Sequence, residues 1–421
     1  MNHVLEIINT VIICLVVTPI ALFTFYSLFV FIPPKKYKQA QKKHKFAAVI
    51  AARNEELVIS NLIKSIQATD YPKELLDIFV IAHNCTDKTA EVAKNLGVNV
   101  IEIKDDDPTH KVKGYALMEG FKEILKLDHE AYALFDADNL VHKDFFTKMN
   151  DAFDSGAKVC TGYRASKNAN DNPVAGVNGL YFLRESIFNS HARTLIGSSC
   201  IVGGSGFIFS RELIEENGWD CLTLAEDAEF SFKYILKGVK AKYVSQAIYY
   251  DEQPTNFLVA MHRHARISKG TFKLFFQNAH KLLFKFFTTF KIMYLDMFIN
   301  FLYGPICILS VLWFPFYYTY LPIQMIIASN TPELVSYLLM ILKMVLLCIV
   351  LPLTIQNIVL YIASSKKEPK KNIFNCILTL IFFPFYNMAV CVANVFGIIN
   401  PRQKWKQVKH DKVVSIEQIS S

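Results

Sequence analysis

Hydrophobic positions divide this chain into three regions. Residues 4–32 are predominantly apolar with a single charge, Glu6, so the stretch is long enough to cross a bilayer as a helix. Between residue 46 and about residue 270, short apolar runs alternate with polar stretches. Three further long apolar runs follow, at 297–329, 334–364 and 373–399. The pattern predicts a globular domain placed between membrane-spanning helices.

Within the globular region the apolar residues follow two different spacings. Short apolar runs typical of buried strands occur at 46–51, 76–82, 98–103 and 131–135. Helical spacing is found between them, at 55–68, 86–96 and 113–127. Strands that alternate with helices predict an α/β domain with a parallel sheet. Ligands bind such sheets at the carboxyl ends of the strands, which here carry Arg53-Asn54-Glu55, His83-Asn84 and Asp136-Ala-Asp138.

The same pattern gives the expected domain boundaries. We expect an N-terminal transmembrane helix at 1–33 and a cytoplasmic α/β domain at 46–270. A Phe-rich segment interrupted by Lys, 271–296, is predicted to be an amphipathic helix at the membrane interface. A C-terminal transmembrane region at 297–400 and a basic cytoplasmic tail at 401–421 complete the chain.

Basic residues gather beside the apolar runs. The chain has 421 residues, of which 52% are apolar, and a formal net charge of +8. Its Lys and Arg clusters lie at 34–38, 41–45, 366–371 and 402–406. This placement is typical of the positive-inside rule and of contact with anionic membrane lipid, so we expect no nucleic-acid partner. The nine cysteines include no C-x-x-C pair, which favours a reducing, cytosolic face for the domain of a multi-pass cell-membrane protein.

The run 373–399 leaves the number of membrane crossings open. Basic clusters lie on both sides of it, and a single crossing would place them on opposite faces of the membrane. The run could turn back at Phe383-Pro384-Phe385 or end as an interfacial helix. Alternatively, one of the two basic clusters lies outside the cytoplasm.

Two acidic clusters are the main candidates for chemistry. Asp136 and Asp138 could share Mn²⁺ or Mg²⁺ with the oxygens of a diphosphate, because these ions prefer oxygen ligands. The structural alternative is a helix N-cap. Glu226-Asp227 could supply a general base, and the alternative is an exposed first turn of a helix, where acids favour the helix dipole.

A glycine-rich turn and an arginine pair are further candidates. Gly204, Ser205 and Gly206 could let backbone amides approach a ligand, or could form a turn before a buried strand. Arg263 and Arg266 could clamp a diphosphate, or could contact lipid headgroups. The neighbouring histidines, His262 and His264, are expected at the surface rather than as metal ligands.

Taken in order, these segments resemble the membrane-bound family 2 glycosyltransferases, the group of the hyaluronan, cellulose and poly-N-acetylglucosamine synthases. The resemblance covers roughly residues 30 to 412. The segments that carry it are Ile50-Ala-Ala-Arg-Asn-Glu-Glu56, Asn84-Cys-Thr-Asp-Lys-Thr-Ala90, Lys113-Gly-Tyr-Ala-Leu117, Asp136-Ala-Asp138, Gly203-Gly-Ser-Gly-Phe207, Leu224-Ala-Glu-Asp227 and Trp405-Lys-Gln-Val-Lys-His410.

The resemblance implies a GT-A-type nucleotide-sugar-binding domain inserted between transmembrane helices. It implies transfer from a nucleotide-diphosphate sugar, usually a UDP-sugar, with inversion at the anomeric carbon. Asp138 with Asp136 would hold the metal, and Asp227 would be the base. The other substrate-binding candidates are Arg53, Asn54, Glu55, Lys113, Gly204, Ser205, Gly206, Glu226, Arg263 and Arg266. The acceptor would be a lipid-linked sugar or a glycan, with partners in cell-envelope biosynthesis.

Two departures from the family pattern affect these expectations. His83 stands where the family usually has an Asp near the uracil ring, so the nucleotide base stays open. Arg263-His-Ala-Arg-Ile267 replaces the Q-x-x-R-W of processive members, and Ile267 offers no indole on which a sugar can stack. We therefore expect one or a few sugars to be added per encounter. The alternatives are a processive synthase and a degenerate, non-enzymatic membrane partner.

Overall fold

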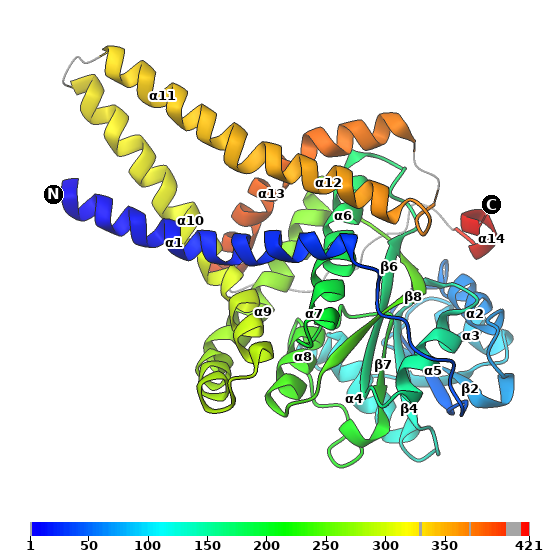
Figure 1. Ribbon diagram of the computed structural model, residues 1–421. Helices are drawn as coiled ribbons and strands as arrows, with labels where there is room; N and C mark the ends of the chain where they lie inside the picture. Colours follow the sequence, from blue (N-terminus) through cyan, green and yellow to red (C-terminus); the bar gives the residue numbers. More distant parts are fainter. Residues whose placement is uncertain (1, 328–330, 370–371, 401–413, 421) are drawn as a thin grey trace.

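The computed structural model describes residues 2–327, 331–369, 372–400 and 414–420, and it consists of a sheet domain and a set of long helices. Figure 1 shows α1, α10 and α11 extending away from the sheet domain, while α6, α9 and α13 lie close to it. The basic tail predicted at 401–421 lies mostly outside the described residues, apart from the short helix α14, Ile416–Ser420.

The domain is built on one eight-stranded sheet with the order β3-β2-β1-β4-β7-β6-β8-β5. The strands are β1 Phe46–Ala52, β2 Leu76–His83, β3 Asn99–Ile103, β4 Ala131–Asp136, β5 Leu140–Val141, β6 Val159–Ser166, β7 Phe207–Ser210 and β8 Ala241–Asp251. The first four strands are parallel, as predicted. The sheet also contains antiparallel pairs that were not predicted, because β7 pairs antiparallel with both β4 and β6, and β5 pairs antiparallel with β8.

The predicted helices are present but shorter. The domain helices are α2 Ile59–Gln67, α3 Thr89–Asn95, α4 Lys113–Ile124, α5 Phe145–Asp154, α6 Pro173–Arg184, α7 His191–Leu195 and α8 Glu226–Leu236. Helix α2 begins four residues later than the predicted 55, after a turn in which the Val58 amide donates to the Glu55 carbonyl. Asn54, with a positive φ of 57°, precedes this turn, and the amide of Glu55 donates to the Thr89 hydroxyl.

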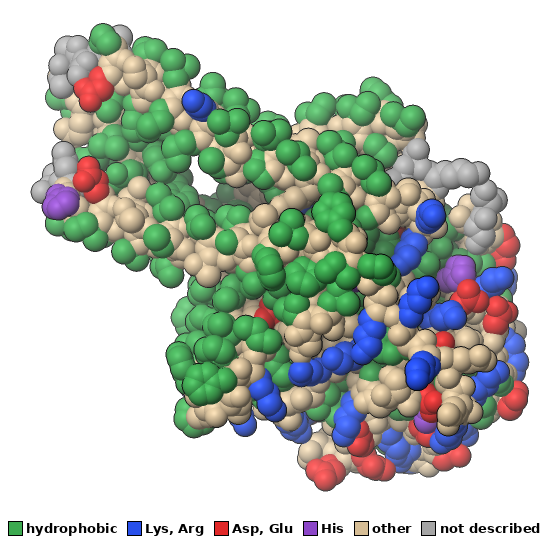
Figure 2. All heavy atoms as spheres, in the orientation of Figure 1, with side chains coloured by type: hydrophobic (Ala, Val, Ile, Leu, Met, Phe, Trp, Pro, Cys, Tyr) green, Lys and Arg blue, Asp and Glu red, His purple; other side chains and the backbone are tan. Residues whose placement is uncertain are grey.

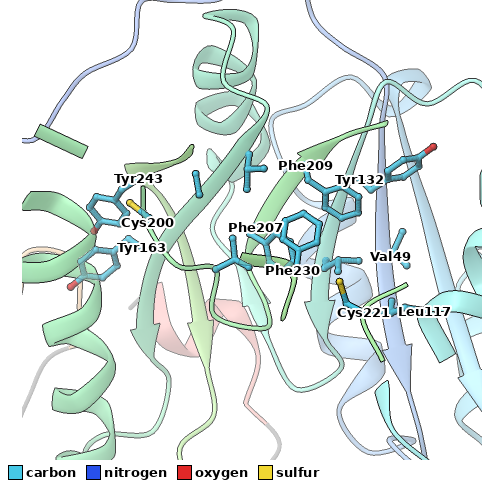
Figure 3. Packing of buried hydrophobic residues seen from close by; sticks show 14 of the residues in the cluster. Val49, Leu117, Tyr132, Tyr163, Cys200, Phe207, Phe209, Cys221, Phe230 and Tyr243 are labelled. Atoms are coloured by element: carbon cyan, nitrogen blue, oxygen red, sulfur yellow. The ribbon is translucent and has the colours of Figure 1, made fainter. Parts of the chain in front are cut away.

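Aromatic side chains fill the core on one face of the sheet. Phe207 and Phe209 of β7 pack against Phe230 of α8, with ring centroids 5.6 and 5.2 Å apart. The ring centroid of Tyr132 of β4 lies 5.6 Å from that of Phe209, and Figure 3 shows these rings close together beside the strands. Because all four residues are almost fully buried, this cluster fixes where α8 begins relative to the end of β4.

Four helices are long and apolar enough to cross a membrane: His3–Phe31, Ile292–Ile327, Pro332–Ser364 and Ile373–Ile399. They correspond to α1 (Asn2–Ser27) with the 3₁₀ turn after it, α10 (Ile292–Ile327), α11 (Thr331–Val345) continued by α12 (Leu351–Ser364), and α13 (Ile373–Ile399). The four long apolar runs predicted from the sequence are thus helices. Figure 2 shows hydrophobic side chains covering these helices and charged ones gathered on the sheet domain.

Helix α13 is continuous through the site where a reversal was considered. Pro384 lies inside the helix, and Figure 1 shows that α13 bends part-way along its length. A proline removes one backbone hydrogen bond and kinks a helix without reversing it. The chain therefore does not turn back at Phe383-Pro384-Phe385.

Helix α9, Phe257–Thr289, connects the domain to the long helices. Its 33 residues run through position 270, where a domain boundary was predicted, so the predicted interfacial segment continues a helix that belongs to the domain. The helix contacts α8 of the domain as well as α10 and α13. Its later part exposes Phe276, Phe284 and Phe287, which is compatible with the amphipathic character expected there.

A buried ion pair joins the domain to α10. Arg193 of α7 is fully buried, and its Nε lies 3.1 Å from Oδ2 of Asp296, which is also buried. Its other nitrogens bind Asn300 Oδ1 at 2.8 Å and Glu185 Oε1 at 3.2 Å. Most of the acceptors that offset the cost of burying the Arg193 charge therefore come from α10.

We expect Asp296→Ala to lower the free energy of unfolding by about 3–5 kcal/mol, because it leaves the buried Arg193 without its main counterion. Equilibrium unfolding in mixed detergent micelles would measure the loss. The matched control is Glu212→Ala, which breaks the exposed Lys158–Glu212 pair and should cost at most about 1 kcal/mol. Equal losses in the two variants would contradict the prediction.

Candidate functional site

A cavity of about 1260 Å³ lies at the carboxyl ends of the strands and extends to the long helices. Most of the candidates from the sequence line it: Arg53, Glu55, Lys113, Asp136, Asp138, Gly204, Glu226, Asp227, Arg263 and Arg266. Three candidates, Asn54, Ser205 and Gly206, are not among the lining residues. The fold therefore gathers side chains separated by more than 200 residues around one space.

Lys113 connects three of these segments. It is the first residue of α4, and its Nζ donates to Asp136 Oδ1 at 2.5 Å and to the Gly204 carbonyl at 2.6 Å. Glu226 Oε1 lies 3.8 Å away. Burial would lower the pKa of the Lys113 ammonium, but Asp136 and Glu226 outweigh it and raise that pKa. Lys113 is therefore a permanent positive charge between the two acidic clusters.

More acidic than basic side chains surround Asp138. Burial raises the pKa of its carboxyl to about 7, and the neighbouring Asp251 and Asp136 add to the shift. In the described part of the chain, no three His, Cys, Asp or Glu side chains are arranged to hold a metal ion by themselves. The residues nevertheless fit a divalent cation that is also bound by ligand oxygens, since such an ion would neutralise the carboxylates of Asp136 and Asp138.

Asp227 occupies the first turn of α8 and faces Gly204. Its Oδ1 accepts from the Ala228 amide at 2.8 Å, and a Cβ on Gly204 would lie 3.2 Å from its Oδ2. Burial raises the pKa of Asp227, although the Ala228 amide, Lys113 and Arg266 oppose the shift. Burial also raises the pKa of the adjacent Glu226 to about 7. Asp227 thus has a hydrogen bond and neighbouring cations that favour its ionised form against burial, and its Oδ2 faces Gly204 at the cavity.

The loops after β1 and β2 form another wall. Arg53 and Glu55 line the cavity beside His83, which is buried. Burial lowers the pKa of His83, and the charge of Arg53 adds to the effect, so its imidazole is neutral at pH 7. Asn54 has a supporting position, because its Oδ1 accepts from the Thr86 amide at 2.7 Å and holds the two loops together.

Sequence reasoning missed a buried network at the ends of β6 and β8. Asp251 Oδ2 accepts from Arg164 Nη2 at 2.6 Å and from Gln253 Nε2 at 2.8 Å, while Oδ1 accepts from Asn139 at 2.9 Å. Arg263 Nη2 lies 3.6 Å from the same carboxylate. Arg164 and Asp251 belong to β6 and β8, which the sequence analysis did not identify, so the rule that ligands bind at strand ends could have found them only after these strands were recognised.

Helix α9 brings the arginine pair to the site. Arg263 lies over the Phe182 ring, 4.9 Å from its centroid, and Arg266 donates to the Leu224 carbonyl at 3.0 Å, just before α8. His262 is exposed, as predicted. The prediction of a surface position for His264 is wrong, because it is buried with its Nε2 3.2 Å from the Tyr386 hydroxyl of α13. The long helices supply the packing that the sequence could not show.

The sequence pattern described as "Glycosyltransferase like family 2" matches residues 44–270, more than half of the chain. The chain belongs to this glycosyltransferase family. The family resemblance seen in the sequence is thereby confirmed, without singling out the hyaluronan and cellulose synthase group.

Three known proteins illustrate the relationship. The probable glycosyltransferase YdaM of Bacillus subtilis is 25% identical over 244 residues, which cover 56% of this chain and 57% of the relative. The beta-monoglucosyldiacylglycerol synthase of Nostoc sp. is 26% identical over 258 residues, which cover 58% and 53%. The chain thus spans about half the length of these curated relatives. A mannosyltransferase of Pyrobaculum calidifontis, solved with GDP-Man and Mn²⁺, has a TM-score of 0.59 at 14% identity, covering 93% of this chain and 99% of its own.

The structural likeness concerns the fold. It extends over nearly the whole chain of this glycosyltransferase family member, including the long helices. The predicted GT-A fold class is confirmed by the family match together with this neighbour.

The glycine-rich turn leads into β7, as the turn interpretation predicted, and it brings the backbone close to a tyrosine. Gly206 has a φ of +64°, and a Cβ there would lie 2.1 Å from the Tyr249 ring. Ser205 is buried, and its hydroxyl accepts from the Asp136 amide at 3.2 Å. Ser205 and Gly206 therefore hold the end of β4 in place from behind the cavity.

We expect Gly206→Ala to destabilise the protein more than Gly218→Ala does. Gly218 has a similar φ of +65° but open space around it, so its variant should show only the cost of the left-handed backbone, about 1–2 kcal/mol. Gly206→Ala adds the clash with Tyr249, about a further 1–3 kcal/mol. Equilibrium unfolding of the two variants measures the difference, and identical stabilities would show that Tyr249 moves away without cost.

Proposed function

We propose that this protein is a membrane-embedded, inverting glycosyltransferase that moves a sugar from a nucleotide-diphosphate sugar to a lipid-linked acceptor in cell-envelope glycan synthesis. The observation that carries the proposal is that one cavity is lined by Asp136, Asp138, Lys113 and Asp227 and continues among the long apolar helices. Membership of the glycosyltransferase family and the name of the Nostoc relative, beta-monoglucosyldiacylglycerol synthase, support it.

The donor would bind at the wall formed by the loops after β1 and β2. Arg53 offers a positive charge for the diphosphate, and the neutral imidazole of His83 offers a flat surface and a hydrogen-bonding nitrogen for the base. We propose a UDP-sugar as donor. The Pyrobaculum neighbour was solved with GDP-Man, so a guanine nucleotide is the alternative that a donor screen must include.

Asp136 and Asp138 would hold Mn²⁺ or Mg²⁺ on the donor diphosphate. When bound, the ion supplies positive charge where the departing diphosphate becomes more negative. Two side chains of the protein would also stabilise the negative charge on the diphosphate: Lys113, which is held beside Asp136, and Arg266 of α9. Both cations are already in position, so little reorganisation is needed as the charge develops.

Asp227 would act as the general base. An acceptor hydroxyl that reaches its free oxygen gives up its proton to the carboxylate as the hydroxyl oxygen bonds to the anomeric carbon. The bond from that carbon to the diphosphate breaks on the opposite face, and its electron pair leaves with the nucleotide. One base is enough for such a displacement, and a raised pKa makes Asp227 a stronger base than an exposed aspartate.

The proposed function is tested by a donor screen with the purified, full-length protein in detergent. UDP- and GDP-sugars are incubated with lipid extract, and the products are analysed by mass spectrometry. The proposal requires a nucleotide diphosphate and a lipid that is heavier by one or a few sugar residues. No transfer and no donor hydrolysis with any nucleotide sugar would exclude it.

We expect Asp227→Asn to lower the transfer rate by a factor on the order of 10²–10⁴, because an amide cannot accept the acceptor proton. Donor binding should survive, since the shape of the side chain is kept. Asp220→Asn is the matched control, because Asp220 pairs with Lys233 at the surface outside the cavity and should keep its activity. A variant at 227 with half the wild-type rate would show that another group is the base.

We also expect activity to depend on a divalent ion through Asp138. EDTA should stop transfer, and added Mn²⁺ or Mg²⁺ should restore it in the wild type but poorly in Asp138→Ala. Asp128→Ala, which removes an exposed carboxylate before the start of β4 and outside the cavity, should respond to metal like the wild type. Full activity in metal-free wild-type protein would contradict the prediction.

A further inference from the structure

The cavity has a second end that the proposed chemistry does not use. It extends from the catalytic acids to a wall formed by α6, α10, α12 and α13. Residues that line this end are Tyr181, Asn300, Tyr303, Leu353, Asn387 and Asn394. Three of the four elements belong to the helices long and apolar enough to span a membrane, so a lipid could reach this end from the bilayer.

Arg184 places a positive charge at this end. It is the last residue of α6 and lines the cavity, and a short π-helix, Glu185–Ser190, follows it directly. Interruptions of this kind in a helix are often found at functional sites, because they re-aim the side chains around them. The guanidinium is partly buried and lies 5.6 and 5.9 Å from the centroids of the Phe383 and Phe188 rings.

Arg184 differs from the buried Arg164 and Arg193 in that it forms no ion pair with any described residue. Arg164 and Arg193 form ion pairs at 2.6 and 3.1 Å, and their carboxylate partners help to raise their pKa. Among the described residues, no carboxylate forms an ion pair with Arg184, and burial lowers its pKa to about 10. The neighbouring Glu185 is directed to Arg193 instead. A partly buried cation without a carboxylate partner among the described residues is costly, which favours an anion supplied by a ligand.

The side chain next to Arg184 is also incompletely bonded. Asn357 of α12 is fully buried and accepts from Arg184 Nη1 at 3.5 Å, while its Nδ2 has no hydrogen-bond partner in the described structure. Leu353, one helical turn earlier and on the same face of α12, lines the cavity. Arg184 thus presents N–H donors to the cavity, and Asn357 lies buried behind it, in the wall between the domain and the long helices.

We propose that Arg184 binds the phosphate of a lipid that enters the cavity between α6, α10, α12 and α13, so that the lipid substrate is a phosphate-bearing one rather than a neutral lipid. This rests on the proposed function for the statement that the lipid is the acceptor, and the hydroxyl that reaches Asp227 is then a group of that lipid other than the phosphate. Arg184 is then a specificity-determining residue: it pairs with the phosphate by charge-assisted hydrogen bonds, and the lipid chain lies against the apolar helices. A neutral diacylglycerol would leave the guanidinium uncompensated.

Binding without donor tests the proposal independently of catalysis. The full-length protein is placed in nanodiscs of phosphatidylcholine, and the Kd values of a long-chain polyprenyl phosphate and of the matching polyprenol are compared. We expect the wild type to bind the phosphate about ten-fold more tightly or better. Arg184→Gln should lose this preference and Arg184→Lys should keep part of it. Arg211→Gln, which changes an arginine outside the cavity, should leave it intact.

Competition by phosphatidylglycerol identifies the source of the phosphate. If it displaces the polyprenyl phosphate at equal concentration, the site recognises phospholipid headgroups. If it does not, the site is specific for a lipid monophosphate. Either result supports a phosphate site at Arg184. Equal Kd values for polyprenyl phosphate and polyprenol in the wild type, or an unchanged preference in folded Arg184→Gln, would overturn it.

A purely structural role for Arg184 and a failure of the proposed function give different results. A structural role would change the unfolding midpoint of Arg184→Gln without changing the preference for phosphate over alcohol. The proposed function is judged separately by the donor screen with the wild-type protein. Lipid preference in a wild-type protein that neither transfers sugar to lipid nor hydrolyses any nucleotide sugar would support the phosphate site and exclude the transferase.

Discussion

The carboxylate of Asp251 accepts hydrogen bonds from Arg164, Asn139 and Gln253 and lies within 3.6 Å of Arg263. These partners come from β6, from the loop after β4, from the end of β8 and from α9. Burial would raise the pKa of Asp251, but the two arginines outweigh it and lower that pKa, so the group stays ionised in the interior. The position of Asp138, one residue before Asn139, and the direction in which α9 leaves the domain both depend on this one satisfied charge.

The long helices and the catalytic domain form a single packed unit. Arg193 and Asp296 join α7 to α10, and His264 of α9 contacts Tyr386 of α13. Gly397 of α13 lies so close to α9 that a Cβ would be 2.2 Å from the Ala265 carbonyl. Because these contacts surround the cavity, its wall is partly domain and partly helix. A donor site and a lipid site can therefore share one space without a movement of one part relative to the other.

Within the cavity, lysine side chains lie beside carboxylates that would otherwise repel one another. Lys113 lies between Asp136 and Glu226, and Lys167 donates to the Asp138 carbonyl at 2.8 Å while pairing with Glu252. Asp138 and Glu226 still have raised pKa values, so the compensation is incomplete where the donor and metal are proposed to bind. Incomplete compensation in the ligand-free protein leaves free energy available for binding a charged ligand.

The sequence by itself determined the elements and the candidate residues that follow them. The apolar runs identified β1 to β4 and the four long helices, because spacing and length are local properties of the chain. The motifs identified Lys113, Asp136, Asp138 and Asp227 by their order. Only the tertiary structure decided the antiparallel insertion of β7, which depends on pairing between strands more than 70 residues apart. The same holds for the Asp251 network, the burial of His264 and the unpaired charge of Arg184. Each results from neighbours that folding brings together, and the local sequence does not determine which charged side chain forms an ion pair.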